Sequence, residues 1–85
     1  MKKRSFTLNN KHGLHLRPAT DFVKLTSDFE GEVWLRKGEI EVNAKSILGI
    51  LSLGIDCGDT VEISFEGEEP EAFFEKLEEF FDRRE

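Results

Sequence analysis

The chain has 85 residues, 38% of them hydrophobic and 11% aromatic, which favours one small domain over residues 1–85 and argues against a second. Eighteen Asp and Glu residues against twelve Lys and Arg give a net charge of -6, which argues against nucleic acid or an anionic membrane as the main partner. The single cysteine, Cys57, excludes an internal disulfide, and there is no apolar run of signal-peptide or membrane-spanning length, so we expect a cytoplasmic protein without membrane insertion.

The first two predicted elements are a strand and a helix. The strand is marked by apolar residues that alternate with polar ones, Phe6 and Leu8. The helix covers residues 18–26, where apolar side chains recur at helical spacing, namely Ala19, Phe22, Val23 and Leu25. Pro18 suits the first position of this helix, because proline has no N–H group and the first turn leaves such groups unpaired.

Two strands and a short helix follow. The strands are marked by two pairs of alternating apolar residues, Val33 with Leu35 and Ile40 with Val42. Between the strands, Lys37 and Gly38 form a short connection that predicts a tight hairpin. The short helix is predicted over residues 46–53, with Ser46 as its N-cap and Gly54 as its stop.

The last predicted elements are again a strand and a helix. The strand is marked by the alternating residues Val61, Ile63 and Phe65. An acidic turn at residues 66–69 precedes Pro70, which suits the first position of the helix. One face of that helix is apolar and is formed by Phe73, Phe74, Leu77, Phe80 and Phe81. Glu71 near its start, and Arg83 and Arg84 near its end, complement the helix dipole.

The element order is therefore β-α-β-β-α-β-α. Because each strand has one apolar face, only one side of the sheet needs to be covered. The sequence predicts an α+β fold, an open-faced β-sandwich in which a four-stranded, mostly antiparallel sheet carries three helices on one face. The order of the strands within the sheet does not follow from the sequence.

The stretch GLHLRP at residues 13–18 places a histidine at or just before the start of the first helix. Unpaired N–H groups at a helix start carry roughly half a positive charge and favour an anion such as phosphate. Arg17 adds a permanent cation. An unperturbed imidazole is largely neutral at cytoplasmic pH and can attack phosphorus, so His15 is able to carry a phosphoryl group. This short stretch alone is also open to an alternative without phosphoryl transfer, in which His15 only caps or flanks the helix start and Arg17 is a solvated charge.

The short helix over residues 46–53 carries apolar residues on two sides. Ile50 and Leu53 share one side. The other side gathers Ile47, Leu48 and Leu51. A small domain cannot easily bury both sides, so the second side is a candidate exposed patch of the kind that marks a protein interface. A helix wedged wholly into the core is equally compatible with the pattern. Ser46 is interpreted as a cap, and the same position is suited to a regulatory phosphate beside the patch.

Two stretches together, residues 13–19 (GLHLRPA) and 43–54 (NAKSILGILSLG), resemble the two signatures of the HPr family. This family comprises the histidine-containing phosphocarrier proteins of the bacterial phosphoenolpyruvate:sugar phosphotransferase system. The resemblance spans essentially the whole chain, since its length, its element order, the turn at Gly67 and the terminal helix also agree.

The resemblance implies that enzyme I phosphorylates His15 on Nδ1 and that the phosphoryl group then passes to a histidine of an enzyme IIA. Arg17 would steady the phosphoryl group in both transfers. The implied phosphate cradle consists of Leu16, Arg17, Pro18 and His12. The implied docking surface for partners consists of Ile47, Leu48, Leu51, Thr20 and Leu16. Such a protein is a monomeric carrier rather than a stand-alone catalyst, and we expect no metal and no cofactor.

The resemblance also gives Ser46 a role. Ser46 resembles the position that an ATP-dependent HPr kinase/phosphorylase modifies in many Gram-positive bacteria. The modification hinders phosphoryl acceptance from enzyme I and can recruit a catabolite-control transcription regulator. Two positions depart from the family pattern: Leu16, where a small residue is usual, and His12, where a small polar one is more frequent. His12 either contacts the phosphate or lies in solvent, and we favour solvent.

Other functions were weighed against a phosphocarrier. A metal-binding module on His12 and His15 lacks a nearby cysteine or well-placed carboxylates. An enzyme with Cys57 as nucleophile is disfavoured, because the carboxylates of Asp56 and Asp59 oppose a thiolate; we expect Cys57 to be partly buried beside a turn. A regulatory HPr-like paralogue that signals through Ser46 would lack the active histidine, whereas a paralogue of the nitrogen-regulating phosphorelay would keep it.

Overall fold

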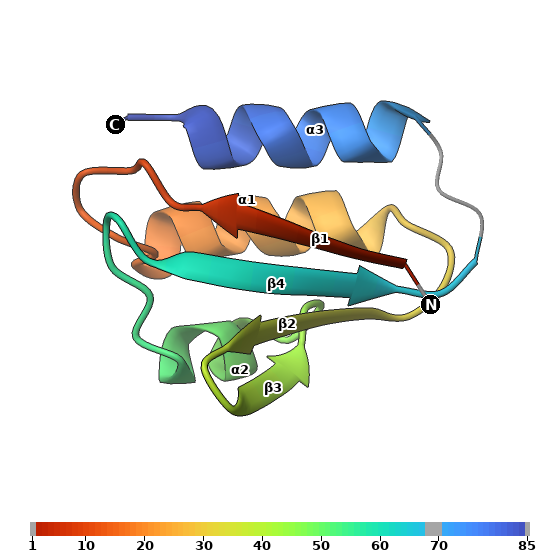
Figure 1. The fold of residues 1–85 in the computed structure, drawn as a ribbon, viewed down its shortest axis with the longest axis horizontal. Coiled ribbons are helices and arrows are strands. Elements are labelled where there is room, and N and C mark those ends of the chain that lie inside the picture. The colour runs from red at the N-terminus through yellow and green to blue at the C-terminus, as the bar shows by residue number, and fades with distance from the viewer. Residues whose placement is uncertain (1, 68–70, 85) are drawn as a thin grey trace.

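The computed structural model describes residues 2–67 and 71–84, and Figure 1 shows their arrangement. The predicted helix start at Pro70 and the turn residues 68 and 69 lie outside these ranges. The element order agrees with the prediction and is β1 (Lys2–Thr7), α1 (Leu16–Ser27), β2 (Val33–Lys37), β3 (Ile40–Asn43), α2 (Ile47–Ser52), β4 (Thr60–Phe65) and α3 (Glu71–Asp82).

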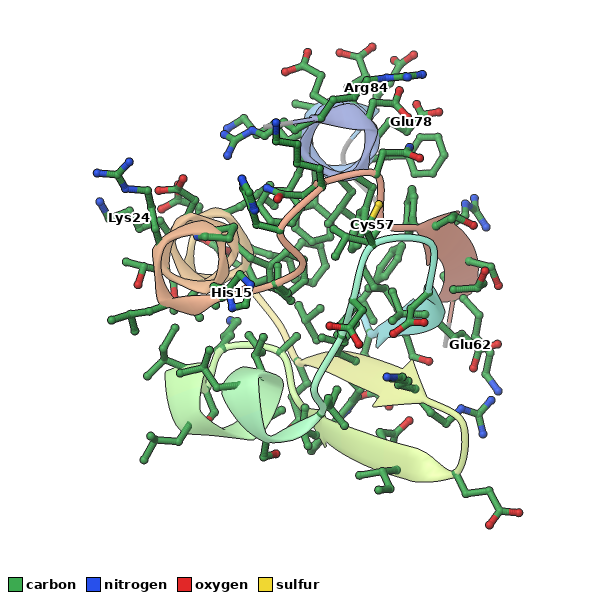
Figure 2. All side chains as sticks on the ribbon, turned by 90° about the vertical axis from the view of Figure 1, so that its left-hand side faces the viewer. His15, Lys24, Cys57, Glu62, Glu78 and Arg84 are labelled. Atoms are coloured by element: carbon green, nitrogen blue, oxygen red, sulfur yellow. The ribbon has the colours of Figure 1, made fainter. Side chains whose placement is uncertain are left out.

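The sheet has the strand order β1-β4-β2-β3, and its three described pairings are all antiparallel. Chain-distant strands therefore lie side by side, with Phe6 of β1 opposite Val61 of β4. The helices cover one face of the sheet, with α1 and α2 behind it and α3 along its β1 edge (Figures 1 and 2). The predicted open-faced sandwich is confirmed. Within the described ranges, no helix has the length and apolar character needed to cross a membrane.

The hairpin between β2 and β3 is as tight as predicted. Lys37 pairs with Ile40, which leaves only Gly38 and Glu39 in the connection. Gly38 has φ +63, a positive value at the first central position of the turn. This position is where a type II′ hairpin turn favours glycine, because a side chain there would be strained.

Phenylalanine fills much of the core between the sheet and the helices. On α3 the buried residues are Phe73, Leu77, Phe80 and Phe81. Phe22 of α1 meets Phe80 with ring centroids 5.2 Å apart, and Phe65 of β4 meets Phe73 at 5.7 Å. Complete burial of one such side chain contributes roughly 1.5–3 kcal/mol to folding. The phenylalanine-rich last helix therefore anchors itself to both α1 and the sheet.

Three details differ from the sequence-based expectations. Leu8 lies one residue beyond β1 but is completely buried, because its N–H donates to Asp59 O at 2.9 Å and holds it inward. Helix α1 begins at Leu16 instead of Pro18, since Ala19 N–H already donates to His15 O at 2.8 Å. The expectation of a partly buried Cys57 is wrong: the side chain is exposed in the turn between α2 and β4.

Candidate functional site

His15 is the N-cap residue of α1. Its backbone is extended, with φ -78 and ψ -175, and its side chain makes no capping hydrogen bond to the helix. The side chain is exposed, between the buried residues Leu14 and Ala19. Figure 2 shows His15 at the end of α1 that faces the viewer. The prediction that His15 stands just before a helix start is confirmed, and its imidazole is open to a reacting partner.

The start of α1 offers hydrogen-bond donors beside this imidazole. The N–H groups of Leu16 and Arg17 have no acceptor within the helix, because they belong to its first turn. Pro18 occupies the third helical position, where its missing N–H group would also have been unpaired. Together with the helix dipole, these donors favour negative charge next to His15. The local chemistry therefore suits an added phosphoryl group.

A close backbone contact positions the loop that carries His15. Gly13 has φ +78, and a Cβ atom there would lie 3.0 Å from the carbonyl oxygen of Ile55 and 3.3 Å from Asp56 Cα. The next residue, Leu14, donates its N–H to Ile55 O at 2.9 Å and buries its side chain. Glycine is needed here for its conformation and for its lack of a side chain.

His15 borders a hollow on the protein surface. The loop before α1, helix α1 and the segment after α3 contribute its lining, which consists of Asn10, Lys11, His12, His15, Arg17, Pro18, Asp21, Arg83 and Arg84. Among the lining residues, four carry a permanent positive charge and one carries a carboxylate. This local excess of positive charge contrasts with the chain's net charge of -6. The charges that line the hollow therefore favour an anion there, although the protein as a whole is acidic.

The structure brings together most of the predicted cradle. His12, Arg17 and Pro18 line the hollow with His15, whereas the Leu16 side chain is 64% exposed and lies outside that lining. Of the predicted cradle residues, Leu16 is thus the one outside the lining, although its N–H group lies in the first turn of α1. The His12 side chain is exposed, and its backbone N–H donates to Asn10 Oδ1 at 3.0 Å.

Sequence reasoning missed five charged or polar residues that line the hollow with His15. These are Asn10, Lys11, Asp21 and, at the other end of the chain, the pair Arg83 and Arg84. For the two arginines the sequence predicted only a favourable interaction with the dipole of the last helix. No local pattern could have placed them here, because Arg83 and Asp21 are separated by 62 residues and meet only in the folded chain.

The predicted docking surface is exposed only in part. On α2, Leu48 is 77% exposed, whereas Ile47 and Leu51 are half-buried and pack against the core. On α1, Leu16 is exposed, and so is Thr20, whose Oγ1 donates to Leu16 O at 2.7 Å. Because α1 and α2 pack against each other, these residues lie on neighbouring helices. The opposite side of α2, with Ile50 and Leu53, is buried as predicted.

Residues 2–83 match the model of a protein family described as the phosphotransferase-system HPr component phosphorylation site. The chain belongs to the HPr family. It is 40% identical over 67 residues to the phosphocarrier protein HPr of Neisseria meningitidis serogroup A, a match that covers 79% of this chain and 75% of that protein. Its identity to the HPr-like protein Crh of Bacillus subtilis is 42% over 67 residues, with 79% of each chain covered.

The fold of this HPr-family chain is also that of solved HPr structures. The crystal structure of HPr-C-His from Thermoanaerobacter tengcongensis aligns with a TM-score of 0.87 at 41% sequence identity, over 96% of this chain and 92% of that one. The crystal structure of a phosphocarrier protein HPr from Bacillus anthracis aligns with a TM-score of 0.86 at 34% identity, over 95% and 96% of the two chains. The predicted HPr resemblance is confirmed.

In this HPr-family chain, Ser46 caps α2 as predicted. Its Oγ accepts the N–H of Gly49 at 3.1 Å, and its backbone is extended, with φ -104 and ψ 114. Gly49 lies against β3, since a Cβ atom at this position would be 3.2 Å from the Cβ of Val42. The hydroxyl of Ser46 therefore fixes the start of the helix that carries Leu48. Phosphorylation of Ser46 stays a prediction.

Proposed function

We propose that this chain is a cytoplasmic, monomeric phosphocarrier of bacterial sugar uptake. In this proposal His15 accepts a phosphoryl group from phospho-enzyme I and passes it to a histidine of an enzyme IIA. One observation carries the proposal above all: the His15 imidazole is exposed at an uncapped helix start, beside unpaired N–H groups and the Arg17 guanidinium. Membership of the HPr family supports the same chemistry.

The proposed reaction is an exchange of one nitrogen–phosphorus bond for another. The lone pair of His15 Nδ1 attacks the phosphorus, and the bond between phosphorus and the donor histidine breaks. Its electron pair returns to the donor imidazole, so no net proton is taken up or released. Arg17 and the N–H groups of Leu16 and Arg17 stabilise the charge on the phosphoryl oxygens. The second transfer follows the same steps, with the enzyme IIA histidine as the nucleophile and His15 as the donor.

In this proposal the partners dock on the surface next to His15. The exposed side chains of Leu16, Thr20 and Leu48 and the half-buried Ile47 and Leu51 supply a largely apolar contact area. A phosphate on Ser46, added by an HPr kinase/phosphorylase, would place about two negative charges at the start of α2 beside this area. The modified protein would accept phosphate from enzyme I less readily and would bind a catabolite-control regulator.

A second candidate function is regulation without phosphoryl transfer. Its support is the 42% identity to the HPr-like protein Crh. Such paralogues lack the active histidine, so the presence of an accessible His15 favours the carrier. A paralogue of the nitrogen-regulating phosphorelay would keep His15, and its chemistry at this residue would be the same.

The decisive experiment is phosphorylation in vitro. The chain is incubated with labelled phosphoenolpyruvate, Mg²⁺ and purified enzyme I, and the incorporated phosphate is tested for acid lability. We expect an acid-labile label that His15→Ala abolishes. His12→Ala is the matched control, since it removes the other histidine and leaves His15 as the attachment site. If His15→Ala labels as well as the original chain, the site assignment is wrong. If only an ATP-dependent kinase adds phosphate, and adds it to Ser46, the regulatory function replaces the carrier.

A further inference from the structure

The hollow beside His15 contains a cation that comes from the other end of the chain. Arg83 follows α3 directly, and its Nη1 lies 3.2 Å from Asp21 Oδ2 on α1. Its guanidinium carbon is 5.2 Å from the centroid of the Phe80 ring. Arg83 and Asp21 both line the hollow that His15 borders. The ion pair therefore joins the residue just after α3 to α1, the helix whose N-cap residue is His15.

The backbone that carries Arg83 is fixed in place. The carbonyl oxygen of Phe81 accepts two hydrogen bonds from Asn9, one from its backbone N–H and one from Nδ2, each 3.1 Å long. The side chains of Phe80 and Phe81 are buried in the core. Arg83 N–H donates to Phe80 O at 3.3 Å. The position of Arg83 relative to the hollow is thus set by the fold, although it lies near the end of the chain.

The Arg83 side chain, in contrast, is held only by contacts near the surface, with Asp21 and with the Phe80 ring. The side chains of Arg83 and Asp21 are 48% and 42% exposed, and an ion pair with this exposure is weak. A phosphoryl group on His15 would bring about two negative charges and three acceptor oxygens into the same hollow. A guanidinium prefers such a group over a single carboxylate, because it can donate two parallel hydrogen bonds to it.

We propose that Arg83 is a second phosphoryl-binding cation of the His15 site. Asp21 holds Arg83 at the rim of the hollow while His15 is unmodified, and Arg83 turns to the phosphoryl oxygens once His15 carries them. The inference rests on the proposed carrier function, which it extends by a residue outside the signature around His15. Arg83 stabilises the phosphorylated form as such, independently of how partners dock.

The test is therefore an equilibrium measurement. The chain is mixed with a known amount of phospho-enzyme I until exchange is complete, and the two phosphohistidines are quantified by ³¹P NMR. Docking affinity changes the rate of this exchange but not its equilibrium constant. We expect Arg83→Gln to lower the equilibrium constant for phosphorylation of the chain by about threefold, the scale of one exposed charge pair. The effect should shrink at about 1 M salt, where charges are screened within about 3 Å.

Arg36→Gln is the matched control. Arg36 also forms an ion pair near the surface, with Glu62, and the two side chains are 42% and 27% exposed. The pair joins β2 and β4, and neither of its residues lines the hollow. Its removal changes the net charge by the same amount, and we expect the equilibrium constant to stay the same. If Arg83→Gln and Arg36→Gln give equal constants, the inference is overturned.

A second pair of variants excludes a merely structural effect. Asp21→Asn should raise the equilibrium constant by about threefold, because it releases Arg83 and removes a carboxylate from the hollow, and the gain should be smaller when Arg83→Gln is added. Arg83→Lys should recover part of the loss, and thermal unfolding checks that each variant is folded. A gain from Asp21→Asn that is equally large with and without Arg83 contradicts the inference. If the original chain accepts no phosphate on His15, the proposed function itself fails, which is a different result.

Discussion

The Ser46 hydroxyl caps α2 at the position of the proposed regulatory phosphate. Its Oγ accepts the Gly49 N–H, and it stands at the start of the helix whose Leu48 is 77% exposed. A hydroxyl and a carboxylate are both good N-cap groups, whereas a methyl group is not. Substitutions at this residue can therefore separate the loss of the cap from the gain of negative charge.

We predict opposite results for two substitutions of Ser46. Ser46→Ala should lower the free energy of unfolding by about 1 kcal/mol, because the Gly49 N–H loses its acceptor, and should leave the rate of phosphorylation by enzyme I unchanged. Ser46→Asp should keep the stability, and its charge beside the docking surface should slow phosphorylation on the order of fivefold. Denaturant unfolding and labelling rates test both. An unaltered labelling rate for Ser46→Asp would argue against docking at α2.

At the scale of elements, α2 and the β2–β3 hairpin offer a comparison of two exposed apolar residues. Leu48 is 77% exposed on α2, and Ile40 is 62% exposed at the start of β3. Of the two, it is α2 that packs against α1, the helix whose N-cap residue is His15. If docking uses the surface between these helices, the two residues should respond differently to the same substitution.

We therefore expect Leu48→Ser to slow phosphorylation by enzyme I on the order of tenfold, the effect of losing an apolar contact worth more than about 1 kcal/mol. Ile40→Ser should leave the rate unchanged. Both variants should keep their free energy of unfolding within about 0.5 kcal/mol, since both side chains are exposed. Labelling kinetics over a range of enzyme I concentrations provides the measurement. Equal slowing in the two variants would show that α2 has no special part in docking.

The elements themselves could be predicted because their signals are local. Alternation marked the four strands, and Gly38 marked the hairpin that its φ of +63 confirms. The start of α1 was misplaced by two residues, because proline fits anywhere in a first turn where its N–H would be unpaired. The strand order was not predictable, since pairing of β1 with β4 joins segments more than fifty residues apart.

At the scale of the whole molecule, Asp59 connects distant segments. Its Oδ2 lies 2.8 Å from Lys37 Nζ at the end of β2 and accepts the Asp56 N–H at 2.8 Å. Lys37 Nζ also donates to Gly54 O, at the start of the loop that leads to β4. The hydrogen bonds from Lys37 and from the Asp56 backbone lower the pKa of Asp59 below its usual 3.8.

This lowered pKa makes stability depend on pH in a definite direction. The contribution of the Asp59 carboxylate to folding is complete above pH 3.8 and is lost as the pH falls through the lower pKa of the folded state. We predict that Asp59→Asn destabilises the protein at neutral pH and that the difference from the original chain shrinks in acid. Denaturant unfolding at several pH values measures this. A difference that stays constant down to about pH 2 would contradict the assigned contacts.

The composition of the site was predictable only where it is contiguous in the chain. His12, Arg17 and Pro18 were found because they adjoin His15 in the sequence, and all of them line the hollow. Asp21 and Arg83 were not found as neighbours, because the packing of α3 against α1 creates their contact. Tertiary structure thus completes the electrostatic surroundings that the local signature begins.

The contact of Gly13 with Ile55 and Asp56 has a consequence for the variability of this site. Its closest approaches are to main-chain atoms, the Ile55 carbonyl oxygen and Asp56 Cα, and the hydrogen bond from Leu14 N–H to Ile55 O adds to it. The imidazole is thus anchored independently of the side chains that surround it. A neighbour such as Leu16 or His12 can therefore vary, and alter which partner surfaces fit here, while the His15 backbone keeps its position.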